Sequence, residues 1–173
     1  MAARAGDQSA YSRLLEAHRG AVFRICRNHV GEDAEALDLT QETFATAFVA
    51  LASFDTTRPF RNWILRIAVN KCHDWARRRT VRHFFTFARP IEDALDLADQ
   101  AASPEDDLAS RQEIEQLRKA IAALPSGIKE PLILCTIEGM SHAAAAQILR
   151  LSEKAIETRI YRAKRRLAEI LEA

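Results

Sequence analysis

The sequence predicts an all-α protein made of two small helical domains joined by an acidic flexible linker. Three observations support this fold class. Apolar residues recur at steps of three and four along most of the chain, the periodicity of helices buried on one face. Strand-like alternation rich in Val, Thr and Tyr is absent, and the 173 residues include only five Gly and five Pro. Charge is arranged in segments of opposite sign, so we expect domains at residues 1–82 and 109–173 and a linker at 83–108.

These charge segments also indicate a class of partner. The net charge is only +1, yet residues 61–82 hold seven bases against one acid, and residues 150–166 hold seven bases against two acids. Between them, residues 91–116 hold nine acids against one base. Two cationic helices suit contact with a polyanion such as nucleic acid. Either the oppositely charged segments meet different partners, or the acidic stretch shields the basic ones. A solvated face is the alternative for each helix, since surface helices are often rich in Arg.

Cysteine usage and hydropathy indicate a cytoplasmic protein. Cys26, Cys72 and Cys135 all lie in apolar helical patterns and are expected to be buried free thiols in a reducing compartment. No apolar run reaches the roughly 18 residues of a membrane span, and no signal-peptide pattern is present. Cys26 and His29 lie one helical turn apart, but no second pair completes a metal site. Neither a metal nor another cofactor is therefore predicted.

The first two helices follow from apolar spacing and capping signals. One is expected from a cap at Asp7 or Ser9 to about His29, and Gly31 ends it. Its inner face should carry Leu14, Leu15, Val22, Ile25 and Cys26. The next helix has two plausible caps, Thr40 with Thr43 or Asp38 with Gln41, and an apolar stripe of Phe44, Phe48 and Leu51. Five acids cluster at its start, either to complement the helix dipole or to dock a basic partner: Glu32, Asp33, Glu35, Asp38 and Glu42.

A short polar turn at residues 53–60 precedes the most cationic helix, residues 60–79, and has properties suited to a pocket for an unstacked base. The apolar face of this helix carries Trp63, Ile64, Ile67, Ala68, Cys72 and Trp75. The opposite face carries Arg61, Arg66, Asn70, Lys71, Arg77, Arg78 and Arg79. The aromatic cluster Phe84, Phe85 and Phe87 follows, and is either part of the first domain's core or a contact surface.

The second domain begins with two further helices. The first, over residues 107–124, should place five apolar residues inward: Leu108, Ile114, Leu117, Ile121 and Leu124. The second is expected to begin late, from about Lys129 to Glu138, because Pro131 is comfortable only in the first turn of a helix. Gly139 is a natural residue to end it.

The last part of the chain has the pattern of a helix-turn-helix unit. Ser141 is expected to cap residues 142–149, and Ser152 to cap a long final helix after a short turn. The outer face of the final helix is polar and cationic: Lys154, Glu157, Thr158, Tyr161, Arg162 and Arg165. The early outer residues of such a helix enter the major groove, and later cations hold phosphates. A generic helical hairpin is the alternative interpretation.

The two halves together resemble the extracytoplasmic-function group of sigma-70 family RNA polymerase sigma factors. The resemblance covers nearly the whole chain, and two matching domains in the correct order are a stronger signal than one helix-turn-helix. The most specific segments are DLTQETFATAF at 38–48, FRNWILRIAVNKCHDWARRR at 60–79, ALPSGIKEPLILCTIEGMS at 123–141 and ETRIYRAKRRL at 157–167.

The resemblance implies a role for each matching surface. Core RNA polymerase would be bound through Asp38, Gln41 and Glu42. The minus-ten promoter element would be bound by Phe54, Asp55, Arg58, Phe60, Arg61, Arg66, Asn70, Lys71, Arg77 and Arg78, with the 54–60 loop receiving a flipped base. The minus-thirty-five element would be bound by Lys154, Glu157, Thr158, Tyr161, Arg162 and Arg165. The family further implies promoter DNA as ligand, a stress or envelope response, and an anti-sigma factor that can hold the protein at the inner membrane.

Four positions depart from the family pattern. Ala144 and Ala145 stand where members commonly have an acid and an aliphatic residue, and Arg150 stands where Gly is common. A left-handed Arg would cost on the order of 1 kcal/mol, so the turn is expected to differ or the helix to run on. Glu157 replaces a base or neutral residue; it can accept a hydrogen bond from cytosine N4 or pair with its neighbours. The promoter sequence therefore does not carry over.

Two other functions fit parts of the sequence. A stand-alone helix-turn-helix regulator would explain the second half, but it leaves residues 38–42 and 63–79 without a purpose. A helical protein that binds another protein through its aromatic cluster would show little salt-dependent DNA binding. An enzyme is not predicted, because no nucleophile–base pair, phosphate-binding loop or metal set is visible.

Overall fold

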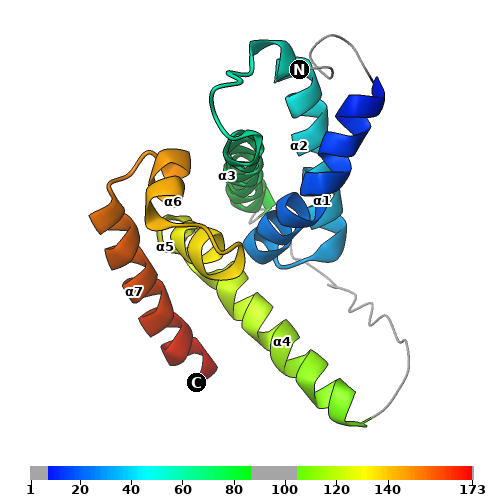
Figure 1. Ribbon diagram of the computed structural model, residues 1–173. Helices are drawn as coiled ribbons and strands as arrows, with labels where there is room; N and C mark the ends of the chain where they lie inside the picture. Colours follow the sequence, from blue (N-terminus) through cyan, green and yellow to red (C-terminus); the bar gives the residue numbers. More distant parts are fainter. Residues whose placement is uncertain (1–7, 87–104, 173) are drawn as a thin grey trace.

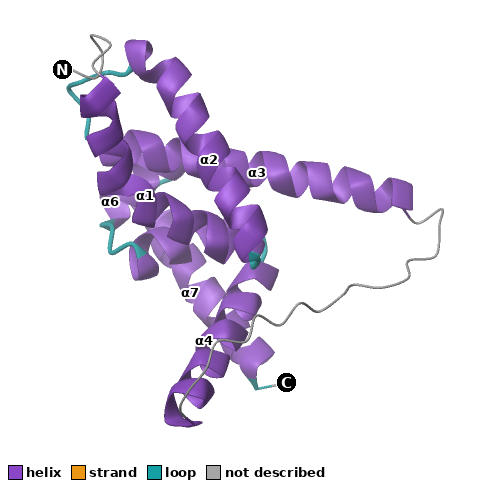
Figure 2. Cartoon of the chain, turned by 90° about the vertical axis from the view of Figure 1, so that its right-hand side faces the viewer, coloured by secondary structure: helices purple, strands orange, loops and turns teal. Residues whose placement is uncertain are grey.

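The computed structural model describes residues 8–86 and 105–172, and within these ranges every regular element is helical (Figures 1 and 2). This confirms the all-α prediction. The elements are α1 Gln8–Val30, α2 Asp33–Ala50, the 3-10 turn η2 Leu51–Ser53, α3 Phe60–Thr86, α4 Glu105–Ala123, α5 Ser126–Leu132, the π turn η3 Ile133–Ile137, α6 His142–Leu149 and α7 Glu153–Leu171.

Helices occupy both ends of the predicted linker. Helix α3 continues to Thr86 and α4 begins at Glu105, so residues 83–86 and 105–108 of the predicted linker are helical. Residues 87–104 lie outside the described part of the chain. Side chains are described for residues 9–81 and 112–172. The cluster Phe84, Phe85 and Phe87 and most of the acidic stretch lie outside this part of the chain.

The N-terminal half is a bundle of α1, α2 and α3. Val22 and Ile25 of α1 pack with Leu39 of α2 and Ile64 of α3, and all four are buried. At the other end of α1, Tyr11 donates a hydrogen bond to the Phe44 carbonyl at 2.7 Å. These contacts follow the predicted inner faces of α1 and α3, because apolar residues one helical turn apart lie on the same side.

The predicted start of α2 was wrong, and one of the three residues of its predicted apolar stripe is exposed. The helix begins at Asp33, so neither the Thr40–Thr43 nor the Asp38–Gln41 pair caps it. Thr40 and Thr43 are buried in the middle of the helix and donate to carbonyls four residues earlier, both at 2.7 Å. Leu51 is buried and Phe44 packs against the core as predicted, but Phe48 is 58% exposed rather than inward. The buried stripe instead carries small and branched residues: Ala36, Leu39, Thr40, Thr43 and Ala47.

Helix α5 also begins earlier than predicted, at Ser126, and it contains Pro131 as its sixth residue. Proline has no N–H, so the Gly127 carbonyl loses its partner within the helix. Arg159 of α7 donates to that carbonyl at 3.2 Å. A contact between distant segments therefore replaces the missing bond, and the chain continues into the π turn, where Glu138 N bonds to Ile133 O at 3.0 Å.

The helix-turn-helix unit forms as predicted. Ser141 accepts from Ala144 N at 3.2 Å and caps α6, while Ser152 accepts from Ala155 N at 3.1 Å and caps α7. The turn between them retains its left-handed residue, because Arg150 adopts φ 56° and ψ 47°. The expectation that this turn would differ or the helix would run on was wrong, and the backbone strain that Gly would avoid is present here.

Replacing Arg150 with glycine should therefore stabilise the protein. We expect a gain of about 0.5–1 kcal/mol, the left-handed penalty less the extra backbone entropy of glycine in the unfolded chain. Urea unfolding of the full chain measures this gain. Arg150→Ala keeps a Cβ atom and removes the same charge, so an equal gain in that variant would show that the backbone conformation is not the cause.

The two halves pack against each other in one continuous core. Helix α1 contacts α4 and α5, and α3 contacts α6, so the halves lie side by side in Figures 1 and 2. Leu65 and Val69, which were not part of the predicted apolar face of α3, are buried, and Val69 adjoins Ile148 of α6. Helix α4 extends away from this body, so Ile114 and Leu117 are exposed although they were predicted to face inward.

Candidate nucleic-acid and polymerase surfaces

The acidic residues of α2 lie directly beside the basic end of α3. Glu42 faces Arg78 at 3.5 Å and Lys71 at 3.9 Å, while Asp38 and Gln41 are exposed. A cavity of about 730 Å³ lies beside the contact between the two helices. It is lined by Glu35, Asp38, Leu39, Glu42, Trp75, Arg77, Arg78 and Val81. Its walls carry both signs of charge around an apolar floor. This composition suits a protein partner with basic and apolar side chains.

The 54–60 loop encloses aromatic side chains. Phe54 is only 9% exposed and packs on Trp63 and Phe60, with ring centroids 4.9 and 5.4 Å away. Phe54 was predicted to contact DNA; in this structure its ring packs inside the loop, and the DNA contact stays a prediction. Asp55 closes the turn by accepting from Thr57 N at 3.0 Å. Asp55 also accepts from Thr57 Oγ1 at 2.6 Å. That hydrogen bond and the one from Thr57 N lower the pKa of the Asp55 carboxyl, with Arg58 at 3.2 Å adding to the effect.

An open cavity adjoins this loop. It measures about 530 Å³ and is lined by Thr57, Arg58, Pro59, Asn62, Trp63, Arg66 and Gln147. Backbone-loop, aromatic, amide and guanidinium groups thus meet at one concave place, the combination that binds an unstacked base and its phosphates. Gln147 belongs to α6, so the C-terminal half forms one wall.

Two of the predicted minus-ten residues bond to the C-terminal half. Arg61 donates to the Glu138 carboxylate at 3.1 Å and to its carbonyl at 3.0 Å. Arg24 of α1 binds the same carboxylate in two-pronged fashion, at 2.7 and 3.0 Å. Arg66 donates to the Gln147 carbonyl. Since the Glu138 side chain is fully buried, it is satisfied entirely by this contact between the halves. A DNA strand can engage Arg61 or Arg66 fully only by replacing these partners.

A second polar cluster is buried between the halves. Lys129 donates from Nζ to the carbonyls of His29 at 2.9 Å and Ala122 at 2.6 Å. Burial lowers the pKa of Lys129 to about 8. Next to it, the Glu130 carboxylate contacts His29 Nε2 at 3.3 Å and also His73 Nε2. Burial lowers the pKa of His29, whereas the hydrogen bond to Glu130 raises that of His73.

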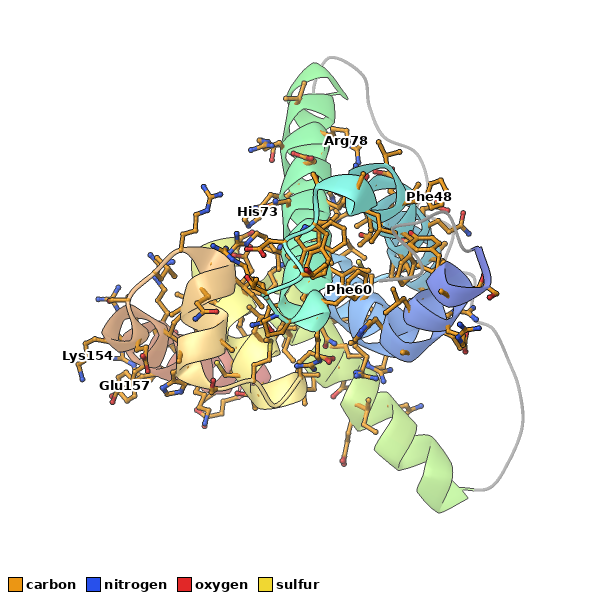
Figure 3. All side chains as sticks on the ribbon, turned by 45° about the horizontal axis from the view of Figure 1, so that its top comes forward. Phe48, Phe60, His73, Arg78, Lys154 and Glu157 are labelled. Carbon is orange, nitrogen blue, oxygen red and sulfur yellow. The ribbon has the colours of Figure 1, made fainter. Side chains whose placement is uncertain are left out.

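Helix α7 presents the predicted outer face to solvent. Lys154, Glu157, Thr158, Tyr161, Arg162 and Arg165 are all exposed. Tyr161 is 65% exposed, and Lys154 pairs with Glu157 at 2.8 Å, which lowers the pKa of the Glu157 carboxyl. Lys154 and Glu157 point away from the body, on the opposite side from Phe48 (Figure 3). An exposed helix with capped N-terminus and polar outer residues has the form of a groove-reading helix.

Sequence reasoning missed the groups between the halves: His29, His73, Lys129, Glu130 and Glu138. His29 was considered only together with Cys26, one helical turn away, as a possible metal ligand. Cys26 is buried against Cys72 of α3 instead. Residues about 100 apart in sequence meet here, and helical periodicity carries no information on such pairs.

Among the described residues, no helix combines the length and hydrophobicity that crossing a bilayer requires.

Known protein families match the chain in both halves. The family model for Sigma-70 region 2 matches residues 14–82, and the family model for Sigma-70, region 4 matches residues 114–167. The RNA polymerase sigma factor NccH of Alcaligenes xylosoxydans xylosoxydans is 36% identical over 97% of this chain and 90% of its own length. CnrH of Cupriavidus metallidurans is 38% identical over 99% of this chain and 91% of its own length.

Solved structures agree with these matches. CnrH in complex with the cytosolic domain of CnrY aligns with a TM-score of 0.71 and 32% identity, over 98% of this chain and 92% of that one. RpoE of Bartonella quintana, in complex with the anti-sigma factor NepR, shares the fold with a TM-score of 0.74 at 23% identity, over 95% of this chain and 98% of that one. The chain belongs to the sigma-70 family of RNA polymerase sigma factors, in its extracytoplasmic-function group.

Proposed function

We propose that this sigma factor binds core RNA polymerase through the α2–α3 surface, the minus-ten element through the 54–60 loop and α3, and the minus-thirty-five element through α7. The observation that carries the proposal is the separation of three surfaces of different chemistry on one chain. The mixed-charge cavity at Glu42 suits a protein, the cavity at Arg66 suits an unstacked base, and the exposed face at Thr158 suits a major groove.

The role requires no covalent chemistry. Melting a promoter costs a few kcal/mol for each unstacked base, which a pocket and phosphate contacts can offset. We therefore assign the chain no enzymatic activity of its own and a cytoplasmic location, where polymerase and DNA are found. Control by an anti-sigma factor is supported by the likeness to CnrH, which has been solved with the cytosolic domain of CnrY.

In vitro transcription with core polymerase on a library of promoters tests this function. We expect the chain to direct initiation to a defined subset, and core polymerase alone to initiate there poorly. Glu42→Lys should abolish the effect by reversing the charge of the proposed polymerase surface, while Glu113→Lys makes the same change on the exposed face of α4 as a control. Promoter-specific DNA binding without any dependence on core polymerase would instead favour a stand-alone regulator.

Two classes of substitution should separate backbone contact from sequence reading. Arg77→Ala with Arg78→Ala removes two exposed cations, so DNA affinity should fall on every promoter and the log–log salt slope should decrease by about 2. Thr158→Ala or Tyr161→Ala should change promoter preference by about 1–3 kcal/mol with the salt slope retained. Fluorescence anisotropy on matched and mismatched duplexes measures both.

The exposed Arg19 of α1 provides the charge control for these variants. Arg19→Ala should leave affinity and salt slope unchanged, because it lies on none of the proposed DNA surfaces. If the α3 and α7 variants produced the same pattern of loss, the proposed division of labour between the two halves would be incorrect.

A further inference from the structure

Three metal-ligating side chains from three helices converge where the two halves meet. His29 of α1, His73 of α3 and Glu130 of α5 each offer one ligand atom, and these atoms all lie within 4.8 Å of one another. His73 lies at the junction of α3 with the C-terminal half, as Figure 3 shows. Two imidazoles and one carboxylate form a ligand set found in zinc sites.

We propose that His29, His73 and Glu130 bind one Zn²⁺ ion, which fastens the N-terminal half to the C-terminal half. Two of the ligands come from the first half and the third comes from the second. The ion would therefore bind only the arrangement in which the halves are packed, and binding would stabilise that arrangement in proportion to the metal concentration.

The spacing of the ligand atoms fits such an ion with little movement. Bonds of about 2.0–2.2 Å at tetrahedral angles place ligand atoms roughly 3.3 Å apart. His29 Nε2 and Glu130 Oε1 are already 3.3 Å apart. His73 now bonds directly to the same oxygen and must withdraw slightly to admit an ion. Its side chain is 38% exposed, which leaves room for that movement.

The surroundings supply both a fixed ligand and a route of entry. His29 is buried, and its Nε2 atom faces Glu130 Oε1 at 3.3 Å, while its Nδ1 atom has no hydrogen-bond partner within the described part of the chain. His73 and Glu130 line a cavity of about 410 Å³ between α3 and the α6–α7 turn. Water in that cavity can provide the fourth ligand that a three-residue zinc site leaves open.

Nearby cations limit the affinity. The cavity also contains Arg66, Arg150 and Arg159, and Lys129 lies behind Glu130. Their positive charge repels a divalent ion, so we expect binding weaker than that of a closed all-cysteine zinc site, and readily reversed by a chelator. The fraction of chains that hold an ion would therefore rise and fall with the free metal concentration.

Titration of the full chain with Zn²⁺ after chelator treatment tests the proposal. Calorimetry should show one ion per chain, and Zn²⁺ should raise the midpoint of thermal unfolding. His73→Ala and Glu130→Gln should each abolish both effects, while the exposed His142→Ala, a histidine outside the cluster, should preserve them. Circular dichroism without metal establishes that the variants fold. If Glu130→Gln fails to fold, His73→Ala still tests the site, because the His73 side chain is partly exposed and its loss should be tolerated.

Co²⁺ distinguishes this site from the three thiols. A site of two histidines and a glutamate should give visible d–d bands without the near-ultraviolet thiolate-to-cobalt charge-transfer band. The appearance of that band, the absence of saturable binding, or binding that persists in His73→Ala would overturn the proposal.

Discussion

Replacing Glu138 with alanine is expected to loosen the packing of the two halves by about 2 kcal/mol, or roughly 30-fold in the ratio of packed to separated forms. The Glu138 carboxylate is buried and receives hydrogen bonds from Arg24 and Arg61, which belong to the other half. Removing a buried anion from two partners would cost more, but both arginines are partly exposed and can be hydrated once it is gone.

Two measurements detect this loosening. Small-angle scattering should give a larger radius of gyration for Glu138→Ala than for the natural chain. Binding of a minus-ten single strand should become tighter, because Arg61 no longer has a competing partner in the C-terminal half. Glu113→Ala, the same substitution on the exposed face of α4, should change neither quantity. An unchanged radius and affinity in Glu138→Ala would show that this carboxylate does not hold the halves together.

Substituting alanine for Gly31 should destabilise the protein by about 2–4 kcal/mol. Gly31 adopts φ +84°, a left-handed conformation that is unfavourable for a residue with a Cβ atom. An added Cβ would also lie 2.8 Å from the Cβ of Ala122 in α4, which is too close for two carbons. The substitution therefore combines backbone strain with a steric clash against the C-terminal half. Urea unfolding measures the loss.

A second glycine separates these two causes. Gly139 also has positive φ, at +64°, but apart from its chain neighbours no described residue has an atom within 4 Å of the position its Cβ would take. Gly139→Ala should thus show only the backbone cost of about 1–2 kcal/mol. Adding Ala122→Gly to Gly31→Ala should recover the steric part, seen as a favourable coupling in a double-mutant cycle. Equal losses at Gly31 and Gly139, with no coupling, would contradict the close approach of α4.

The elements predicted correctly are those whose signals are local. Ser141 and Ser152 cap α6 and α7 because a side-chain oxygen needs only the backbone three residues ahead. Gly31 ends α1 for an equally local reason, its positive φ. The exposed outer face of α7 also followed from helical period alone, since the buried and exposed sides alternate regularly along it.

The errors arise where distant contacts decide. Pro131 lies well inside α5 because Arg159, 28 positions later in the chain, bonds the carbonyl that proline leaves free. The burial of Phe54 likewise depends on Trp63 and on Tyr11, 43 positions earlier in the chain. The partners of Glu130 and Glu138 come from the other half of the chain. No periodic pattern within one helix encodes such pairs.

Arg61 has two proposed partners, Glu138 and promoter DNA, and this affects the interpretation of its mutants. The side chain that we assign to promoter DNA already neutralises a buried anion when no promoter is present. A substitution there would weaken two rival complexes at once, and the losses would partly cancel in any affinity measured from the free protein. A small loss of DNA affinity on substituting Arg61 would therefore underestimate the strength of its contact with DNA. The full loss is measured when Arg61 is substituted in a Glu138→Ala background, where the competing carboxylate is absent.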